Sequence, residues 1–472
     1  MGQSDPAGTS ITMTWAASTD TGGPGIGGYY IFRNGNTTTP IAAVTSGTSY
    51  TDSILVPGTA YTYAIVAFDQ SAPRSITSAL SATIDVGTLG ATPPNVLAVI
   101  VDAGPASLAN ANEIAANTLF ATVTLCSPNT NACQQIDHIQ VDTGSTGLMI
   151  MSEVLNGTAA LQALNDTGSG NPLRECIQFA DGYSWGSLKV ADVQIGGRSL
   201  PSLPVLLVGD PAAGTAPAGC VLPNAENTVA AFGANGVLGI NGFLQDCGAA
   251  CASGAVPAEY YQCPGGQCVP TAVPLNKQLQ NPLGVAALAP DNTGVVIDLP
   301  AVASSSEFSL SGVLHFGLGT LANNTPGGAV QFFTVDGSGT LFTSYGAFVK
   351  QAGSIIDSGS NAYFFTSSLP VCTHSYDSSF YCPTTMATPE VGTIQGATGA
   401  ATRTVNYSVD SADQLFANYG TAFPNLAGPN NVSGTGPVSS FDWGLPFFFN
   451  RTVYVLFENG TFGGTNGPAV GF

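Results

Sequence analysis

Charge is scarce in this sequence, and positive charge is scarcest. Only 8% of the 472 residues are charged, with nine Lys and Arg against 29 Asp and Glu, which gives a formal net charge of −20. Nucleic-acid binding requires clustered basic side chains, so this balance excludes a nucleic acid as the main partner. None of the three lysines follows a glycine-rich phosphate loop, which argues against a nucleotide site of that type.

Long apolar runs and paired histidines are also missing. No stretch approaches the roughly 18 uninterrupted apolar residues of a membrane-spanning helix, so we expect no membrane span. His138, His315 and His374 are far apart and form no H-x-x-x-H pair. We therefore expect no metal site and no cofactor.

Cysteine, in contrast, is present in an even number, and several cysteines sit close together across polar loops, as in disulfide-closed loops. Zinc is the alternative for Cys247, Cys251, Cys263 and Cys268, whose spacing is finger-like. The charge-poor, Ser- and Thr-rich surroundings favour disulfides in an oxidising compartment. The ten disulfide candidates are Cys126, Cys133, Cys176, Cys220, Cys247, Cys251, Cys263, Cys268, Cys372 and Cys382.

The N-terminus does not read as a secretion signal. Residues 1–10, MGQSDPAGTS, have neither a basic region nor an apolar core. Either the protein is cytosolic or a leader was removed before this numbering begins. The cysteines favour removal, so we expect an extracellular or cell-surface protein.

Glycine and proline are abundant, with 58 and 31 residues, which predicts many turns and few long helices. Residues 1–88 contain strand-like runs at 10–15, 28–33, 61–68 and 79–86, separated by turn sequence. With Trp15 on an early strand and LVPGTAY ending at Tyr61, this segment resembles a fibronectin type III domain, a β-sandwich with a tyrosine corner. A Gly/Pro-containing linker is expected at 89–95.

A weak internal repeat organises the remainder of the chain. One apolar strand leads into Asp142-Thr143-Gly144-Ser145, and a second leads into Asp357-Ser358-Gly359-Ser360. Each copy is followed by an apolar segment with glycine, Val237-Leu238-Gly239 in the first and, more loosely, Trp443-Gly444-Leu445 in the second. Two copies in one order predict two similar lobes, at 96–295 and 296–472.

The repeat places carboxyl chemistry at two turns. Glycine lets the backbone turn tightly after each aspartate, and the neighbouring hydroxyls can fix the carboxylate by hydrogen bonds. If the lobes meet at these turns, Asp142 and Asp357 face each other and share a proton, because two close carboxylates do not both ionise. Such a dyad can activate water with one carboxylate and protonate a carbonyl or amine with the other.

Residues from about 96 to 472 resemble a pepsin-type, two-lobed aspartic peptidase. The resemblance rests on the two Asp motifs, on FADGYSWGSLKVADVQIGG, FGANGVLGI and GVLHFGLGT, and on FDWGLPFFFNRTVYVLFENG. It implies a bilobal, all-β, β-barrel domain that binds a polypeptide in the cleft between its lobes. It further implies that Asp142 and Asp357 form the catalytic dyad and that Tyr183, with Trp185 beside it, closes over it as the flap.

The supporting roles also follow from the resemblance. Thr143 and Ser358 would brace the two loops against each other, and Ser145 and Ser360 would bind the outer carboxylate oxygens, while Gly144 and Gly359 form the turns. The expected function is a secreted aspartic endopeptidase that acts at acidic pH.

Three features depart from this pattern. The first motif continues TGLMIM where an aromatic residue is usual a few positions on, and Asn361 follows Ser360 in the second motif. A Cys-rich insert at about 241–285 has no counterpart in it. The sequence as a whole, with the insert and the DWGLPFFF run, also resembles an uncharacterised family of secreted bacterial proteins with no assigned activity. The alternative is therefore a non-catalytic surface or filament-forming protein on the same scaffold, in which self-association through Gly-, Ser- and Asn-rich faces is possible.

Overall fold

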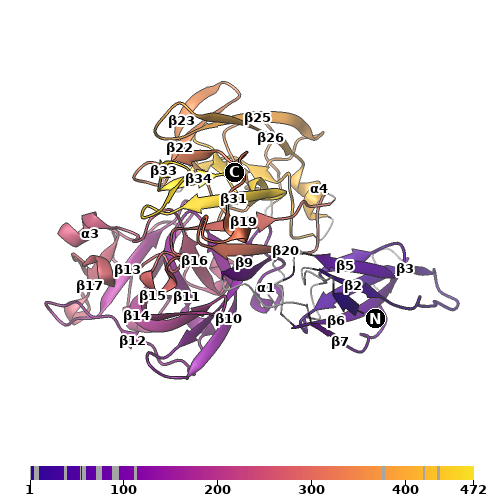
Figure 1. Ribbon diagram of the computed structural model, residues 1–472, viewed down its shortest axis with the longest axis horizontal. Helices are drawn as coiled ribbons and strands as arrows, with labels where there is room; N and C mark the ends of the chain where they lie inside the picture. Colours follow the sequence, from indigo (N-terminus) through magenta and orange to yellow (C-terminus); the bar gives the residue numbers. More distant parts are fainter. Residues whose placement is uncertain are drawn as a thin grey trace.

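Strands dominate the structure, a computed structural model, as the sequence predicted (Figure 1). It describes residues 2–472 except 5–9, 37–39, 54, 56–59, 71–76, 88–94, 111–113, 304, 375–377, 418–419 and 433–435. The expected linker therefore lies outside the described residues apart from Asn95, as does most of LVPGTAY. The α-helices of the described residues are short: α1 (Ala106–Asn110), α2 (Val229–Phe232), α3 (Ala249–Ser253) and α4 (Ala412–Phe416).

The N-terminal module is a sandwich of two antiparallel sheets, in the orders β1-β2-β5 and β4-β3-β6-β7. Burial alternates along β2, and apolar side chains of both sheets, among them Ile11 of β2 and Ile31 of β3, share one core. The last strand begins at Ile84, later than predicted. The strands are β1 (Gly2–Ser4), β2 (Ser10–Thr14), β3 (Ile26–Arg33), β4 (Ala42–Val44), β5 (Ser49–Ser53), β6 (Ala60–Asp69) and β7 (Ile84–Gly87).

The first lobe, magenta in Figure 1, is one side of a large sheet in the order β18-β17-β13-β14-β15-β11-β16-β10-β9-β8. Its buried residues are mostly Val, Leu and Ile, the types favoured where strands are covered on both faces. Its strands are β8 (Val96–Val101), β9 (Leu119–Cys126), β10 (Cys133–Asp142), β11 (Thr146–Met151), β12 (Gln162–Ala163), β13 (Leu173–Gln178), β14 (Tyr183–Ile195), β15 (Arg198–Val208), β16 (Gly236–Ile240), β17 (Tyr260–Gln262) and β18 (Val269–Pro270).

The second lobe, orange to yellow, continues that sheet through β20-β19-β31-β34-β21 and adds a sheet in the order β26-β25-β22-β23-β30-β24-β27. Its strands are β19 (Gly294–Leu299), β20 (Leu310–Phe316), β21 (Phe332–Thr334), β22 (Leu341–Tyr345), β23 (Phe348–Ile356), β24 (Tyr363–Phe364), β25 (Ala387–Gln395), β26 (Thr402–Val409), β27 (Ala427–Gly428), β28 (Asn431–Val432), β29 (Gly436–Pro437), β30 (Asp442–Trp443), β31 (Arg451–Leu456), β32 (Thr461–Phe462), β33 (Thr465–Asn466) and β34 (Ala469–Gly471).

The internal repeat is visible in how the strands pair. In the first lobe β10 ends at Asp142, runs parallel to β16, and is followed by β11, which is antiparallel to β16. In the second lobe β23 ends one residue before Asp357, runs parallel to β30, and is followed by β24, which is antiparallel to β30. The chain thus forms the same three-strand arrangement twice, in a bilobal, pepsin-like, all-β domain. Where along the chain the domains divide remains a proposal, because β19 itself contains the expected boundary at 295/296.

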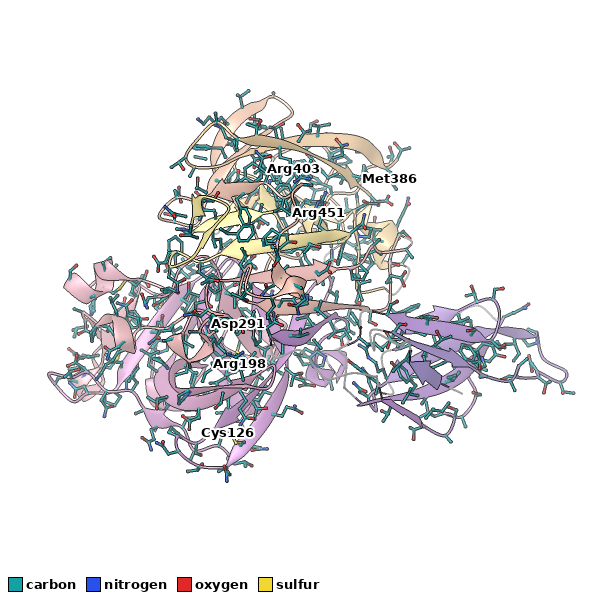
Figure 2. All side chains as sticks on the ribbon, in the orientation of Figure 1. Cys126, Arg198, Asp291, Met386, Arg403 and Arg451 are labelled. Carbon is teal, nitrogen blue, oxygen red and sulfur yellow. A yellow bond between two sulfur atoms is a disulfide. The ribbon has the colours of Figure 1, made fainter. Side chains whose placement is uncertain are left out.

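Several of the few basic side chains make packing contacts within the fold. Arg198 pairs with Asp291 at 3.2 Å, and Arg403 and Arg451 lie over the rings of Phe472 and Phe447 (Figure 2). Cation–ring contacts of this kind stabilise packing and give no ligand site by themselves. Within the part of the chain that is described, no helix is long and apolar enough to cross a membrane.

Candidate active site

Each aspartate turn supports its own carboxylate in the same way. The backbone N–H of the glycine two positions later donates to Oδ1, at 2.6 Å for Asp142 and 2.8 Å for Asp357. The hydroxyl of the serine three positions later donates to Oδ2, at 2.5 Å for Asp142 and 2.9 Å for Asp357. Two donors per carboxylate fix its orientation and stabilise its charged form.

The two turns also hold each other. The hydroxyl of Thr143 donates to the Ile356 carbonyl at 3.1 Å and accepts from the Ser358 N–H at 2.9 Å. Reciprocally, the hydroxyl of Ser358 donates to the Val141 carbonyl at 2.8 Å and accepts from the Thr143 N–H at 3.1 Å. All these groups are buried, so the four hydrogen bonds fix one turn against the other.

This arrangement brings the carboxyl groups together. A Cβ built on Gly144 would lie 2.8 Å from Asp357 Oδ1 and 3.1 Å from Asp142 Oδ1, and one on Gly359 would lie 2.5 Å and 3.1 Å from Asp142 Oδ1 and Asp357 Oδ1. Only glycine leaves room for both inner oxygens. Burial raises the pKa of Asp357 well above its ordinary value, and the charge of Asp142 and the hydrogen bond between the two carboxyl groups act in the same direction.

A third carboxyl group, Asp442, joins this pair from β30. Its Oδ2 lies 2.6 Å from the Ser360 hydroxyl, the same group that donates to Asp357. Burial raises the pKa of Asp442 to about 7, opposed by the Ser360 hydrogen bond and aided by the charge of Asp142. The motif comparison missed Asp442. The sequence signal that could have found it is the loose match between the two copies of the repeat. Strand pairing shows that Asp442 in the second copy takes the place of Val237 in the first.

The three carboxyl groups line a cleft of about 450 Å³ between the lobes. The first lobe contributes Gln140, the hairpin tip between β13 and β14, and residues of α2, and the second contributes Asn361, Phe364 and the loops at 378–379 and 429–431. Asp181 and Glu226 also line it, whereas none of the described lysines and arginines does. The charged residues that line the cleft are therefore all acidic.

The flap residues are placed differently from the sequence prediction. The β13–β14 hairpin does overhang the cleft, but its tip presents Phe179, Ala180 and Asp181 to it. Tyr183 and Trp185 are buried on β14 in a cluster with the Cys176–Cys220 disulfide, and Trp185 donates to the Gly214 carbonyl at 3.0 Å. They lie in the strand next to the tip and do not form the tip itself, because the turn occurs before Tyr183 and not after it.

The Cys-rich insert supports the same hairpin. Its strand β17 pairs with β13 along the edge away from β14, and β18 pairs with β17. All ten cysteines form disulfides: Cys126–Cys133, Cys176–Cys220, Cys247–Cys251, Cys263–Cys268 and Cys372–Cys382. The disulfide prediction is confirmed and the zinc interpretation is wrong, since no thiolate is left to bind zinc. Among the described residues no group of three His, Cys, Asp or Glu is arranged as a metal site.

A second close pair of carboxyl groups lies where the insert packs on the hairpin. Glu175 on β13 is buried, Asp246 of the insert is half-buried, and the Tyr260 hydroxyl donates to Asp246 at 2.6 Å. Burial raises the pKa of both carboxyl groups, and the charge of Asp246 adds to the rise for Glu175. Neither residue lines the cleft between the lobes, so this pair belongs to the packing of the insert on the hairpin.

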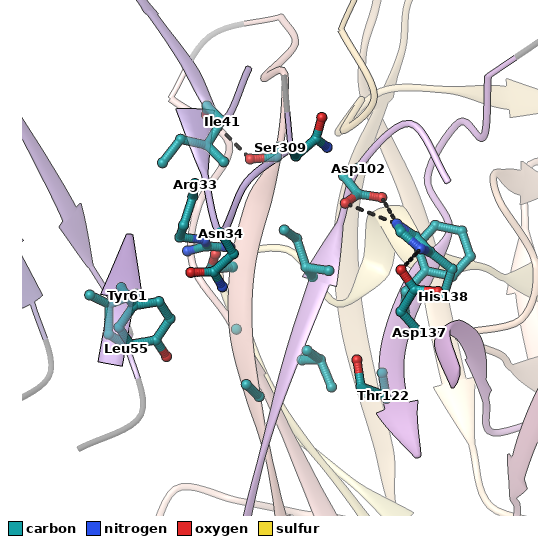
Figure 3. Close-up of a pocket in the computed structure, with 18 of the residues that line it drawn as sticks. Arg33, Asn34, Ile41, Leu55, Tyr61, Asp102, Thr122, Asp137, His138 and Ser309 are labelled. Atoms are coloured by element: carbon teal, nitrogen blue, oxygen red, sulfur yellow. Dashed lines mark hydrogen bonds and ion pairs between the residues drawn. The ribbon is translucent and has the colours of Figure 1, made fainter. Parts of the chain in front are cut away.

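A second hollow of about 400 Å³ lies between the N-terminal module and the large sheet (Figure 3). Arg33 and Tyr61 line it from the module, and His138 lines it between Asp102 and Asp137 from the sheet. Burial alone would lower the pKa of His138, but hydrogen bonds with both carboxylates outweigh it and raise that pKa to about 10. The histidine is thus a charged member of an ion-pair cluster and is unsuited to proton transfer near neutrality.

The comparisons with known proteins agree with a two-part chain. The model of a family described as "Protein of unknown function (DUF3443)" matches residues 91–472. The chain belongs to this family. The DUF3443 portion therefore contains both aspartate turns, the hairpin and the insert, and the family's description assigns it no activity.

Curated relatives match only a short segment of this DUF3443 protein. Three enzymes of Cellulomonas fimi match: exoglucanase B, 44% identical over 71 residues; endoglucanase B, 37% over 89; and exoglucanase A, 44% over 82. These segments are 15%, 19% and 17% of this chain and 6%, 8% and 9% of the enzymes. The chain thus spans less than a tenth of each enzyme, and segments of this length suggest a fibronectin III-like module as the shared part.

A solved structure also resembles the chain. The crystal structure of an aspartic proteinase from Irpex lacteus matches with a TM-score of 0.43 and 14% identity, covering 79% of this chain and 96% of that one.

Proposed function

We propose that this protein is a secreted aspartic endopeptidase in which Asp142 and Asp357 hydrolyse a peptide bond through one bound water. The observation that carries the proposal is the mirrored pair of turns, which supports each carboxylate with the same donors and holds the two inner oxygens around a pair of glycines. Structural acid pairs such as Glu175 and Asp246 lack both features.

The two carboxyl groups have different environments and so take different roles. Because the pKa of Asp357 is raised well above its ordinary value, the shared proton rests on Asp357. Asp142, held by short hydrogen bonds from Gly144 and Ser145, is the carboxylate. In the first step Asp142 takes a proton from water, the water oxygen bonds to the peptide carbonyl carbon, and Asp357 gives its proton to the carbonyl oxygen. In the second step Asp142 gives its proton to the amide nitrogen, the C–N bond breaks, and one hydroxyl of the tetrahedral intermediate returns a proton to Asp357 as it becomes the carbonyl of the new carboxyl group.

The cleft suits an extended polypeptide. Its walls come from both lobes, so a chain lying across the dyad would contact the Phe179 tip on one side and the 378–379 and 429–431 loops on the other. The five disulfides support export, because such bonds persist in oxidising compartments.

The test compares four proteins on a denatured generic substrate between pH 3 and pH 6. Asp142→Asn and Asp357→Asn remove one titratable carboxyl each with almost no change in shape. Asp413→Asn, at a half-buried position on α4 where Asp413 pairs with His374 outside the cleft, is the matched control. We expect cleavage by the wild type and the control, blocked by a statine-type analogue, and at least about 1000-fold less by either dyad variant.

Absence of cleavage by folded, disulfide-intact wild type, with no stabilisation by the analogue, would contradict the proposal. It would favour the non-catalytic surface or filament-forming alternative, which predicts concentration-dependent polymers that Asp142→Asn leaves intact.

A further inference from the structure

One hydroxyl group at the site faces two carboxyl groups. The Ser360 Oγ lies 2.9 Å from Asp357 Oδ2 and 2.6 Å from Asp442 Oδ2. A serine hydroxyl has one proton and can donate to only one of them, while an ionised carboxylate can only accept. Both contacts are therefore hydrogen bonds only if one carboxyl group carries a proton and donates it to Ser360.

The first lobe has no such third group. The pairing of β10 with β16 sets Val237 opposite Gln140, and the pairing of β23 with β30 sets Asp442 opposite Ile355, at the equivalent place two residues before the aspartate. Beside the first turn, accordingly, the position is filled by a buried valine, and Ser145 donates to Asp142 alone. The shared serine is a property of the second lobe.

The surroundings favour the proton on Asp442. Its Oδ1 is buried without a hydrogen-bond partner among the described residues, a costly position for an ionised carboxylate. The titratable groups that face it are Asp357 beyond the end of β23 and Asp142 across the dyad, both acidic, with Asp181 and Glu226 across the cleft. On β24 the ring of Tyr363 packs against Trp443. No described cation lines the cleft to stabilise a charge on Asp442.

We propose that Asp442 is a positioning residue that acts through Ser360: as a neutral acid it donates to the Ser360 hydroxyl, which in turn donates to the outer oxygen of Asp357. The inference rests on the proposed peptidase function and deepens it, because it sets the upper end of the working pH range. When Asp442 loses its proton, its carboxylate attracts the Ser360 proton, and Asp357 loses a donor and gains a negative neighbour.

The decisive experiment is a double-mutant cycle on the ratio of cleavage rates at pH 8 and pH 4. In Asp442→Asn the side-chain amide donates to Ser360 at every pH, so this ratio should rise about tenfold over the wild type, as expected for removing one titration near neutrality. In the Ser360→Ala background the same Asp442→Asn change should raise the ratio much less, because only the direct effect of the Asp442 charge on Asp357 is then left to remove.

Two results would overturn the proposal. Equal pH profiles for the wild type and Asp442→Asn would show that Asp442 does not control the site. A tenfold rise that persists in the Ser360→Ala background would show that Asp442 acts through its charge alone. If Asp442→Asn does not fold, Asp442→Val, which copies the first lobe and removes the competing acceptor, should raise the ratio in the same way.

A stability measurement separates this inference from the peptidase proposal. A carboxyl group whose pKa is higher in the folded than in the unfolded state stabilises the fold at low pH, and this stabilisation is lost as the pH rises through the folded value of about 7. The unfolding temperature of Asp442→Asn minus that of the wild type should therefore increase from pH 4 to pH 8. This difference should appear even if neither protein cleaves any substrate. A constant difference across this range would show that Asp442 carries no proton and would overturn the inference.

Discussion

Comparing the turn that carries Asp142 with the turn that carries Asp357 separates what the site needs from what each lobe adds. The glycine, the hydroxyl donors and the cross-turn hydrogen bonds match one for one, and so does the three-strand arrangement beneath them. The side chains that pack behind the two strand arrangements do not match. Aliphatic residues pack behind the first turn, whereas Phe441, Trp443 and Phe447 pack behind the second. Carboxylate geometry is thus fixed locally and tolerates different cores.

The lobes also differ in what covers the dyad. The first lobe supplies a hairpin that is widened by the insert and cross-linked by the Cys176–Cys220 disulfide, while the Cys372–Cys382 disulfide of the second lobe closes a short loop. In the proposed mechanism, this asymmetry around a symmetric dyad lets one carboxyl group act as base and the other as acid. The Cys176–Cys220 disulfide holds the strands of the hairpin next to its tip.

The largest effect should come from the covalent link in the hairpin. The double change Cys176→Ser with Cys220→Ser opens a loop with a sequence separation of 44, which by chain entropy should cost about 4 kcal/mol of the free energy of unfolding. The matched control, Cys372→Ser with Cys382→Ser, opens a separation of 10 and should cost about 3 kcal/mol. Urea-induced unfolding measures both, and a larger loss for the second-lobe pair would contradict this ordering.

The symmetry of the dyad can be tested at its two glycines. Alanine at Gly359 would place its Cβ 2.5 Å from Asp142 Oδ1, and alanine at Gly144 would place its Cβ 2.8 Å from Asp357 Oδ1, so each must displace the opposite carboxylate. We expect each variant to lose about 100-fold in kcat/KM, the typical cost of misplacing a reacting group by about 1 Å.

Gly327, where an added Cβ meets nothing within 4 Å, provides the control, and Gly327→Ala should keep full activity. A large loss at only one of Gly144 and Gly359 would show that the two turns are not equivalent in the working site.

The sequence could predict the parts of the site that are local. Asp-Thr-Gly-Ser and Asp-Ser-Gly-Ser contain their own turn and their own donors, so the support of each carboxylate follows from a few adjacent residues. That the two turns face each other depends on contacts between distant segments, such as those of Thr143 with Ser358. The all-β class and the disulfides followed from composition and spacing in the same way, and both are confirmed. The catalytic roles of Asp142 and Asp357 remain predictions.

What the sequence could not predict depends on pairing between distant segments. Asp442 reaches Ser360 only because β30 lies beside both β23 and β24, and the insert supports the hairpin only because β17 pairs with β13. The error in the flap had the same origin: the register of β13 against β14 puts the turn before Tyr183 and gives the cleft Phe179.

The smallest expected effect concerns Glu226, an acid in the segment before α2 that packs beside the hairpin tip. Burial raises the pKa of Glu226 to about 8, and the charge of Asp181 and a hydrogen bond with it add to the rise. Since the folded pKa lies above the unfolded value of about 4.3, Glu226 stabilises the fold fully below that value and loses this contribution as the pH rises through 8. The unfolding temperature of Glu226→Gln should therefore gain about 3 °C on that of the wild type between pH 5 and pH 9.

Two further variants locate this effect at the hairpin. Asp181→Asn removes only the neighbouring charge and leaves Glu226 buried, so the pH dependence of its unfolding temperature should fall between those of the wild type and Glu226→Gln. Glu390→Gln, on β25 of the second lobe, should follow the wild type if the first-lobe wall alone carries this pH sensitivity. Parallel curves for the wild type, Glu226→Gln and Asp181→Asn would instead show that Glu226 is ionised in the folded protein at both ends of the range, and that the hairpin tip is open to solvent.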